Sequence, residues 1–474
     1  MTTMAIIIAA VQLLGLVFAV FALLSTRTSQ GTVAWVVTLI AFPWLGIPAY
    51  LLFGRTRFNG YVTARVAHEI DFRKKLGLEY SKLSCYMSPH PQTESHDQLK
   101  TFEVLAKLPF TEGNNAHLLI NGRATFDDIF DGIRQAKDYV LIQFYIVNEG
   151  LIGDAFWECL VEARERGVRV YFLYDEIGSY ELADWYLEGL RKNGVQVYSF
   201  HSNRNVLNRF QLNFRNHRKI VVVDGLTTWV GGHNIGDEYI NKDPKYPFWR
   251  DTHIRLDGPA ALGAQLSFVE DWHWVTEETL QLNWKPVETC CSNQRALVLP
   301  SGPSDTFETA SLMMQYAMHV AKKRIWIASP YFVPDEGVLQ SLRLAALRGV
   351  DVRILIPEKP DNLLIYLSAF SFVSGILKAG VKIMRYQRGF LHQKVFLVDD
   401  YLSAVGTTNM DNRSFRLNFE VTVLLDDRTF AAEVEKMLLD DFSHAQEMLI
   451  KDAESKPLWF KILCRAAYLS APVQ

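Results

Sequence analysis

Two stretches of the chain share one spacing: HRKIVVVD at residues 217–224 and HQKVFLVD at residues 392–399. In both, a histidine is followed two positions later by a lysine, and five positions after that by an aspartate. A Gly-x-x-Asn begins seven residues beyond each aspartate and ends at Asn234 or Asn409. A single match arises by chance in roughly a few per cent of chains this long, so two matched copies indicate a duplication.

The sequence around both motifs alternates strand and helix patterns in the same order. This predicts an α/β fold of mixed sheets flanked by helices, duplicated about a pseudo-twofold axis. We expect a first domain at residues 101–285 and a second at residues 286–474. The matching segments are strands at 139–147, 168–174, 325–329 and 350–356 and helices at 155–166 and 338–347.

The two motifs carry residues suited to reaction at a phosphodiester. Side chains two residues apart on a strand share a face, so His217 projects with Lys219, and His392 with Lys394. Lysines and amides stabilise charge on the phosphate oxygens. One histidine can attack phosphorus while the other transfers protons. Neither a metal nor a cofactor is expected.

Asp251 and Glu420 are assigned supporting roles, and Asp224 and Asp399 are counted with the catalytic residues of the motifs. We expect Asp251 to orient His217 and Glu420 to orient His392, because both carboxylates follow the motifs at comparable distances. Asp224 and Asp399 belong to the motifs, but their positions at strand ends favour a turn or salt-bridge role over direct chemistry.

The N-terminus carries two apolar runs, at residues 4–24 and 35–53, joined by a short polar loop. Each has about the 20 residues that span a bilayer, so residues 1–54 are predicted to form a transmembrane hairpin. Prolines in the second run leave a re-entrant segment as an alternative, and a cleaved signal peptide is a weaker alternative for the first. Basic residues within 55–75 place the remainder in the cytoplasm, after a linker at residues 55–100.

Composition restricts the remaining function classes. The net charge is −3, which disfavours a dedicated nucleic-acid binder. The five cysteines match no zinc-binding spacing and are expected to be reduced.

The motifs, the strings WRDTHIRLDGP and SPYFVPDE, and the N-terminal apolar runs closely resemble the phospholipase D superfamily, and within it the bacterial cardiolipin synthases. The resemblance extends over nearly the whole chain. It implies two phospholipase-D-like domains with one site between them, a multi-pass protein of the bacterial inner membrane, and phosphatidylglycerol and other anionic phospholipids as partners. It also implies a nucleophilic His217. One mild departure is Gly232-His233 in the first Gly-x-x-Asn.

Three further segments have open interpretations. The basic and aromatic segment at residues 201–219 is expected to bind a head group, with a solvated connection and a single-stranded nucleic-acid site as alternatives. Arg215, Arg218 and Tyr331 are the expected substrate-binding residues. The apolar segments at residues 363–377 and 458–469 are interpreted as packed helices or as elements at the bilayer surface.

The leading hypothesis is therefore a phosphatidyltransferase that joins two phosphatidylglycerols and releases glycerol. A hydrolase with the same site, acting as a phospholipase D or a nuclease, is the alternative. A membrane protein that has lost catalysis is disfavoured, because both motifs are intact.

Overall fold

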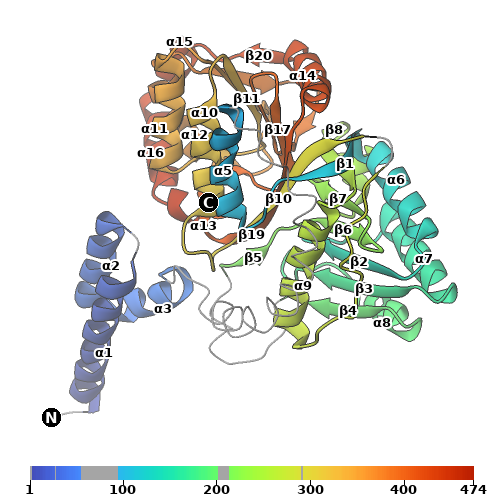
Figure 1. Ribbon diagram of the computed structural model, residues 1–474. Helices are drawn as coiled ribbons and strands as arrows, with labels where there is room; N and C mark the ends of the chain where they lie inside the picture. The colour runs from blue at the N-terminus through green and yellow to red at the C-terminus, as the bar shows by residue number, and fades with distance from the viewer. Residues whose placement is uncertain (1–2, 27, 55–93, 201–212, 290–291) are drawn as a thin grey trace.

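The computed structural model describes residues 3–26, 28–54, 94–200, 213–289 and 292–474 (Figure 1). Its N-terminal part contains α1 (Thr3–Ser25), α2 (Ser29–Ala41) and α3 (Pro43–Phe53). Within the described residues, α1 alone is long and apolar enough to cross a membrane. Among the residues that the structure describes, Cys159 and Cys464 are buried and form no disulfide.

The second apolar run is divided between α2 and α3, so it is not one continuous helix, and its crossing of the membrane stays a prediction. The break falls at Phe42, which adopts φ −135° and ψ 59°. Pro43 causes it, because proline restricts the residue before it and has no N–H to continue the helical hydrogen bonds. α2 and α3 still pack against α1, with the Gln12 amide donating to the Ile40 carbonyl at 2.7 Å. The basic cluster used to predict the orientation lies outside the described residues.

The first half of the duplicated portion places helices on both faces of its strands. The repeated strand–helix pattern of the sequence is present here. Its elements are β1 (Thr111–Ile120), α6 (Asn121–Gln135), β2 (Tyr139–Phe144), α7 (Leu151–Glu165), β3 (Arg169–Tyr174), α8 (Asp184–Lys192), β4 (Gln196–Ser199), β5 (Arg215–Asn216), β6 (Ile220–Val223), β7 (Thr227–Gly231), η2 (Asp237–Ile240), β8 (Trp249–Arg250), β9 (Thr252–Asp257) and α9 (Ala261–Thr276).

The second half repeats this order and adds helices at its end. Its elements are β10 (Gln294–Ser301), α10 (Thr309–Val320), β11 (Arg324–Ala328), β12 (Phe332–Val333), α11 (Glu336–Leu347), β13 (Asp351–Pro357), α12 (Leu363–Leu377), β14 (Lys382–Tyr386), β15 (Phe390–Leu391), β16 (Val395–Val398), β17 (Leu402–Gly406), β18 (Met410–Asp411), α13 (Asn412–Arg416), β19 (Asn418–Asp426), α14 (Arg428–Ser443), β20 (Ala445–Glu447), α15 (Ile450–Glu454), α16 (Leu458–Tyr468) and η3 (Ala471–Val473).

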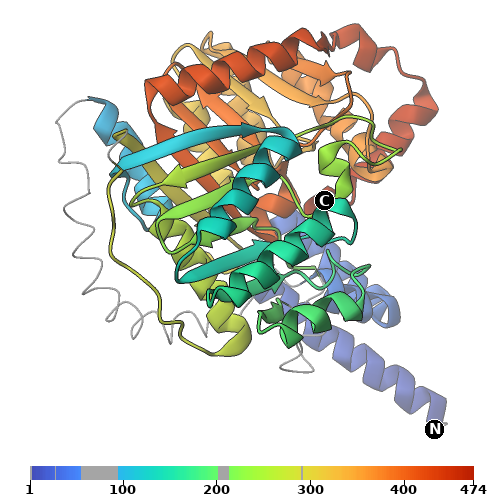
Figure 2. The ribbon, with the colours of Figure 1, turned by 90° about the vertical axis from the view of Figure 1, so that its right-hand side faces the viewer.

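The sheet topology confirms the duplication. The main sheet runs β20-β14-β13-β11-β16-β17-β19-β10-β1-β9-β7-β6-β2-β3-β4, with β5 attached to β19. From its centre out to β4 on one side and β14 on the other, the sequence of parallel and antiparallel neighbours is the same in both directions. β20, antiparallel to β14, has no counterpart among the described strands. The pseudo-twofold axis therefore passes between β1 and β10, where Thr111 lies opposite Ala296. Figure 2 shows the strands of the two halves side by side.

One hydrophobic core is shared by both halves, and each half has another of its own. The shared core holds Phe268 and Trp272 of α9 together with Phe430 and Leu438 of α14. α6, α7 and α8 cover the opposite face of the first half, and α10, α11 and α12 that of the second. Because the shared core joins the halves, their relative position is fixed by buried apolar surface.

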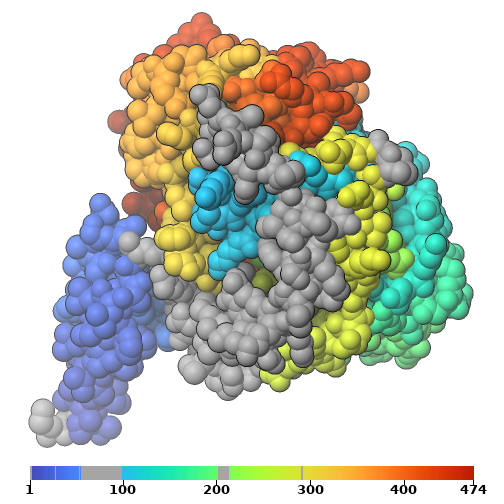
Figure 3. All heavy atoms as spheres, viewed as in Figure 1, coloured from blue at the N-terminus to red at the C-terminus, as the bar shows by residue number. Residues whose placement is uncertain are grey.

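An additional helix, α5 (Glu94–Ala106), precedes the first half in the chain but packs on the second. Leu99, Phe102 and Ala106 are buried in the core of the second half. Figure 3 shows α5, in light blue, against the yellow and orange surface of the second half. The predicted start of the first domain at residue 101 falls inside this helix. The predicted boundary at residue 285 lies between α9 and β10 and stays a prediction.

Candidate active site

Both motif histidines are held by strand residues of the opposite half. β5, just before His217, pairs in parallel with β19, and the His217 N–H donates to the Phe419 carbonyl at 2.9 Å. β15, just before His392, pairs in parallel with β8, and the His392 N–H donates to the Arg250 carbonyl at 2.8 Å. The two histidines therefore occupy equivalent positions across the pseudo-twofold axis.

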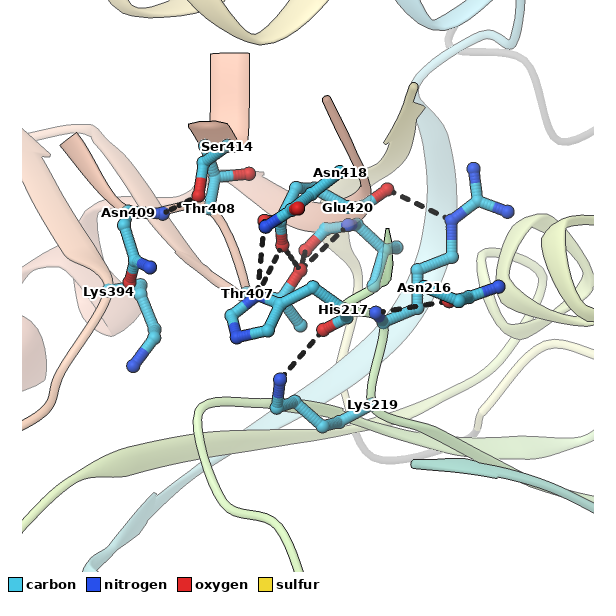
Figure 4. A network of polar contacts seen from close by, with 12 residues as sticks. Asn216, His217, Lys219, Lys394, Thr407, Thr408, Asn409, Ser414, Asn418 and Glu420 are labelled. Atoms are coloured by element: carbon cyan, nitrogen blue, oxygen red, sulfur yellow. Dashed lines mark hydrogen bonds and ion pairs between the residues drawn. The ribbon is translucent and has the colours of Figure 1, made fainter. Parts of the chain in front are cut away.

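These crossed strand pairs also cross the carboxylates. His217 Nδ1 lies 2.9 and 3.0 Å from the two carboxylate oxygens of Glu420 (Figure 4). His392 Nδ1 lies 2.7 Å from Asp251 Oδ2. The predicted pairing of Asp251 with His217 and of Glu420 with His392 is wrong. The reason is that Phe419 immediately precedes Glu420 and Arg250 immediately precedes Asp251, so each strand pair brings a histidine to the carboxylate of the other half.

Burial and nearby charges keep both imidazoles neutral. Burial lowers the pKa of His217, and Glu420 opposes this only in part. Burial and the Lys394 ammonium lower the pKa of His392 to about 3. Burial would raise the pKa of Glu420, but the hydrogen bonds from His217 and Thr407 and the nearby Lys219 ammonium hold it below its usual value. Each neutral ring thus donates its Nδ1 hydrogen to a carboxylate and keeps a lone pair on Nε2, as a nucleophile or base requires.

The two lysines belong to the same electrostatic unit. Lys219 Nζ donates to the His217 carbonyl at 2.7 Å, and Lys394 Nζ donates to the His392 carbonyl. Burial lowers the pKa of Lys394 to about 8. Both ammonium charges lower the pKa of both histidines. The two motifs therefore form one site, as the sequence predicted.

The motif aspartates lie at strand ends and hold the backbone. Asp224 accepts hydrogen bonds from the N–H groups of residues 137, 138 and 139 at 2.8–2.9 Å. Asp399 accepts from those of residues 322, 323 and 324 at 2.7–3.3 Å. Both adopt positive φ, 54° and 51°, which aspartate tolerates better than most residues. These contacts confirm the predicted turn role.

The two asparagines have different surroundings. The Asn234 side-chain oxygen accepts from the Ile146 N–H at 3.1 Å, and its side-chain nitrogen donates to the Tyr239 hydroxyl at 2.8 Å. Asn234 therefore connects neighbouring loops. The Asn409 side chain points toward Lys394 in Figure 4, and its buried oxygen has no protein partner. Asn409 therefore lies on the Lys394 side of the site, whereas Asn234 is occupied by loop contacts.

The preceding glycines allow the sheet to close around the carboxylates. A Cβ at Gly232 would lie 2.0 Å from Asp251 Oδ1. A Cβ at Gly406 would lie 2.5 Å from the Val421 carbonyl, on the strand that carries Glu420. His233, at the departure from the family pattern, is buried with Nδ1 3.0 Å from His253 Nδ1. Burial lowers the pKa of His233 to about 4, so this pair packs uncharged behind Asp251.

One of the predicted substrate-binding residues does not face the site. Arg218 is buried, pairs with Asp271 at 2.8 Å and donates to the Glu420 carbonyl at 3.1 Å. That prediction is wrong, because Arg218 lies between His217 and Lys219 and projects from the opposite strand face. It anchors the motif to α9. Gln393 has the same place in the second motif and donates to Asp441 of α14 at 2.7 Å.

Arg215 and Tyr331 lie close to the catalytic groups. The charges of Arg215 and Arg413 both act on Tyr145, whose ring centroid is 5.0 Å from that of His217. The Tyr331 hydroxyl donates to Asp361 at 2.6 Å, and the Asp361 charge acts on Lys394. Residues 201–212 of the predicted head-group segment lie outside the described residues.

Three further side chains complete the surroundings of His217. The Thr407 hydroxyl donates to Glu420 at 2.5 Å and the Asn418 amide at 3.1 Å. Tyr145 covers His217, with Lys219 Nζ 5.3 Å from its ring centroid. Thr407 sits inside the Gly-x-x-Asn and Asn418 lies two residues before Glu420, so both lie next to residues already singled out from the sequence. Tyr145 carried no such signal.

Comparisons with known proteins match nearly the whole chain. A family model described as cardiolipin synthase, PLD-like domain, matches residues 129–244 and 314–442. Another, described as phospholipase D-nuclease N-terminal, matches residues 5–55. Cardiolipin synthase A of Pseudomonas putida strain GB-1 is 45% identical over 98% of this chain and 97% of its own. That of Pseudomonas aeruginosa strain LESB58 is 43% identical over 100% of this chain and 96% of its own.

Among solved structures, a phosphatidylserine synthase of Haemophilus influenzae is similar with a TM-score of 0.61. It is 17% identical and covers 80% of this chain and 100% of its own. At that identity the likeness supports the fold alone.

Proposed function

The chain belongs to the cardiolipin synthase family of phospholipase-D-like proteins, and we propose that it joins two phosphatidylglycerols into cardiolipin and releases glycerol. The observation that carries this proposal is the pair of crossed histidine–carboxylate contacts, at 2.9 and 2.7 Å, beside two buried lysines. Two histidines of this kind support a covalent transfer in two displacement steps.

In the first step, His217 Nε2 attacks phosphorus of one phosphatidylglycerol. A nitrogen–phosphorus bond forms, the bond from phosphorus to the glycerol oxygen breaks, and His392 supplies the proton that glycerol takes away. The bound anionic phosphodiester raises the pKa of His392, and Asp251 stabilises the imidazolium. Glu420 stabilises the positive charge that develops on His217.

In the second step, the neutral His392 takes the proton from the free glycerol hydroxyl of a second phosphatidylglycerol. The oxygen attacks phosphorus, the bond to His217 breaks, and cardiolipin forms. Lys219, Lys394 and Asn409 stabilise the charged phosphate oxygens in both steps. Arg215 lies beside Tyr145 and is proposed to hold the second anionic head group.

Product analysis tests the reaction. Purified full-length protein is given vesicles of phosphatidylglycerol labelled in the head-group glycerol, without nucleotide. We expect cardiolipin and free glycerol in equal amounts, reversal by excess glycerol, and no product from His217→Ala. Phosphatidic acid as the main product would favour the hydrolase alternative. A requirement for a cytidine-activated lipid would refute covalent transfer.

To test the intermediate, the protein is incubated with lipid labelled in the phosphatidyl group and denatured without acid. The labelled peptide is then identified by mass spectrometry. The family resemblance favours His217 as the nucleophile. Label on His392 would exchange the two roles without changing the scheme. Activity that is lost on chelation and restored by a divalent ion would contradict the proposed mechanism.

The proposed location is the bacterial inner membrane, with the catalytic portion in the cytoplasm. Support comes from α1 and from the basic residues between Arg55 and Lys75. Protease added outside sealed right-side-out spheroplasts should leave the catalytic portion intact, and digestion of that portion would refute this orientation.

A further inference from the structure

α16 is an amphipathic helix whose apolar face points away from the protein. With about 3.6 residues per turn, its exposed apolar side chains fall on one stripe. Trp459 is 63% exposed, Leu458 73% and Leu469 81%. The stripe consists of Leu458, Trp459, Ile462, Leu463, Ala466 and Leu469.

The other face of α16 is fixed on α12. The Ser371 hydroxyl donates to the Cys464 carbonyl at 3.1 Å. The rings of Phe370 and Phe460 lie 5.1 Å apart between centroids, and Cys464 and Ala467 are buried. Figure 1 shows α16 beside α12, on the flank of the second half that faces away from the first. The outward stripe is therefore held by a packed helix pair.

The charged residues of α16 itself are positive, and the Lys461 ammonium also donates to the Glu454 carbonyl at 2.7 Å. Lys461 and Arg465 are exposed and lie along one border of the stripe on the helix. After Glu454 the sequence contains no further aspartate or glutamate. An apolar stripe with a basic border is the pattern of a helix that lies in the head-group region of an anionic bilayer.

We propose that α16 is a second membrane contact, lying flat in the bilayer surface with its apolar stripe among the lipids. This surface goes beyond the proposed reaction and is separate from the N-terminal apolar helices. A second copy of the chain fits the stripe poorly. One helix face offers less area than the roughly 800 Å² per partner of a stable dimer, and a symmetric contact would bring two basic borders together.

The contact lies next to the active site in the chain. α12, which carries α16, begins at Leu363, two residues after the Asp361 that accepts the Tyr331 hydroxyl. Leu363 and Leu364 of its first turn are also exposed. A helix docked on the bilayer through this pair would fix how the site faces the lipid surface.

Photo-cross-linking in the full-length chain tests the proposal. p-Benzoylphenylalanine replaces Trp459 or Ile462, and in a matched control it replaces Trp185 of α8, which is 57% exposed in the first half. The proteins are placed in nanodiscs of phosphatidylglycerol and phosphatidylcholine and irradiated. We expect lipid adducts at residues 459 and 462 at about ten times the yield at residue 185, in line with the partition of a large apolar side chain.

We also expect the yield to fall several-fold in discs of phosphatidylcholine alone. Equal yields at residues 459 and 185, or cross-links joining two copies of the chain, would overturn the proposal. An unchanged yield without anionic lipid would overturn its electrostatic part. Cross-linking requires no turnover, so the result is independent of whether the proposed transfer reaction is correct.

Discussion

Substitution of Asp251 by asparagine should impair His392 and leave His217 in its native state. The contact between His392 Nδ1 and Asp251 Oδ2 is 2.7 Å long, and the carboxylate is fully buried, so solvent does not screen it. A hydrogen bond to a charged group contributes about 1.5–3 kcal/mol. Its loss alone corresponds to a fall in kcat of about 10- to 150-fold.

The asparagine amide adds a second effect, because it can donate to Nδ1 and place the ring hydrogen on Nε2. A reversed tautomer removes the lone pair that must accept the proton of the second lipid. In a serine protease triad the equivalent change lowers kcat on the order of 10⁴-fold. We therefore expect Asp251→Asn to lower kcat by more than about 10-fold and less than about 10⁴-fold.

Modification by diethyl pyrocarbonate, mapped by peptide mass spectrometry, reads out each histidine separately. Asp251→Asn should slow carbethoxylation of His392 at least tenfold and leave the rate at His217 unchanged. Glu420→Gln, the matched control, should do the reverse. If Asp251→Asn slowed His217 instead, the crossed pairing would be refuted.

Three further outcomes follow from the contacts of the motif residues. Asp399→Ala should lower the free energy of unfolding by about 2–4 kcal/mol in chemical denaturation, because three backbone N–H groups lose their acceptor and alanine is strained at φ 51°; full stability with lost activity would instead assign it to catalysis. Arg218→Met should destabilise the fold by about 3–5 kcal/mol, since it leaves Asp271 buried without its cation, and a raised KM at unchanged stability would contradict this. Activity should fall as pH rises through about 8, because Lys394 then loses its proton and its positive charge. Lys394→Arg should move this alkaline fall of the pH–rate profile to higher pH. If both proteins lose activity at the same alkaline pH, the fall belongs to another group.

The fold and the centre of the site could be predicted from sequence because they depend on local patterns. The spacing of His217 and Lys219 follows from strand geometry, and the repeated spacing at His392 reveals the duplication. The same geometry excludes Arg218 from the site face, because Arg218 lies between His217 and Lys219 on the strand.

The carboxylate pairing could not be predicted in the same way. Asp251 lies 34 residues after His217, and Glu420 lies 28 residues after His392, so distance along the chain favours pairing within each half. Only the parallel contacts of β5 with β19 and of β8 with β15 show that the partners exchange. β5, β8 and β15 have two residues each, too few to give a periodic signal. The break at Phe42 precedes Pro43, one of the prolines that made a re-entrant segment an alternative for this run.

The exchange of carboxylates has the symmetry of an isologous homodimer, in which residue i of one copy contacts residue j of the other, and j contacts i. Here both copies lie in one chain, and the symmetry is no longer enforced. One histidine faces a glutamate through both oxygens, and the other faces an aspartate through one. A true homodimer must mutate both sites together, whereas this fused chain can alter one alone. Fusion thus frees the two histidines to specialise, while neither half can assemble a histidine–carboxylate pair by itself.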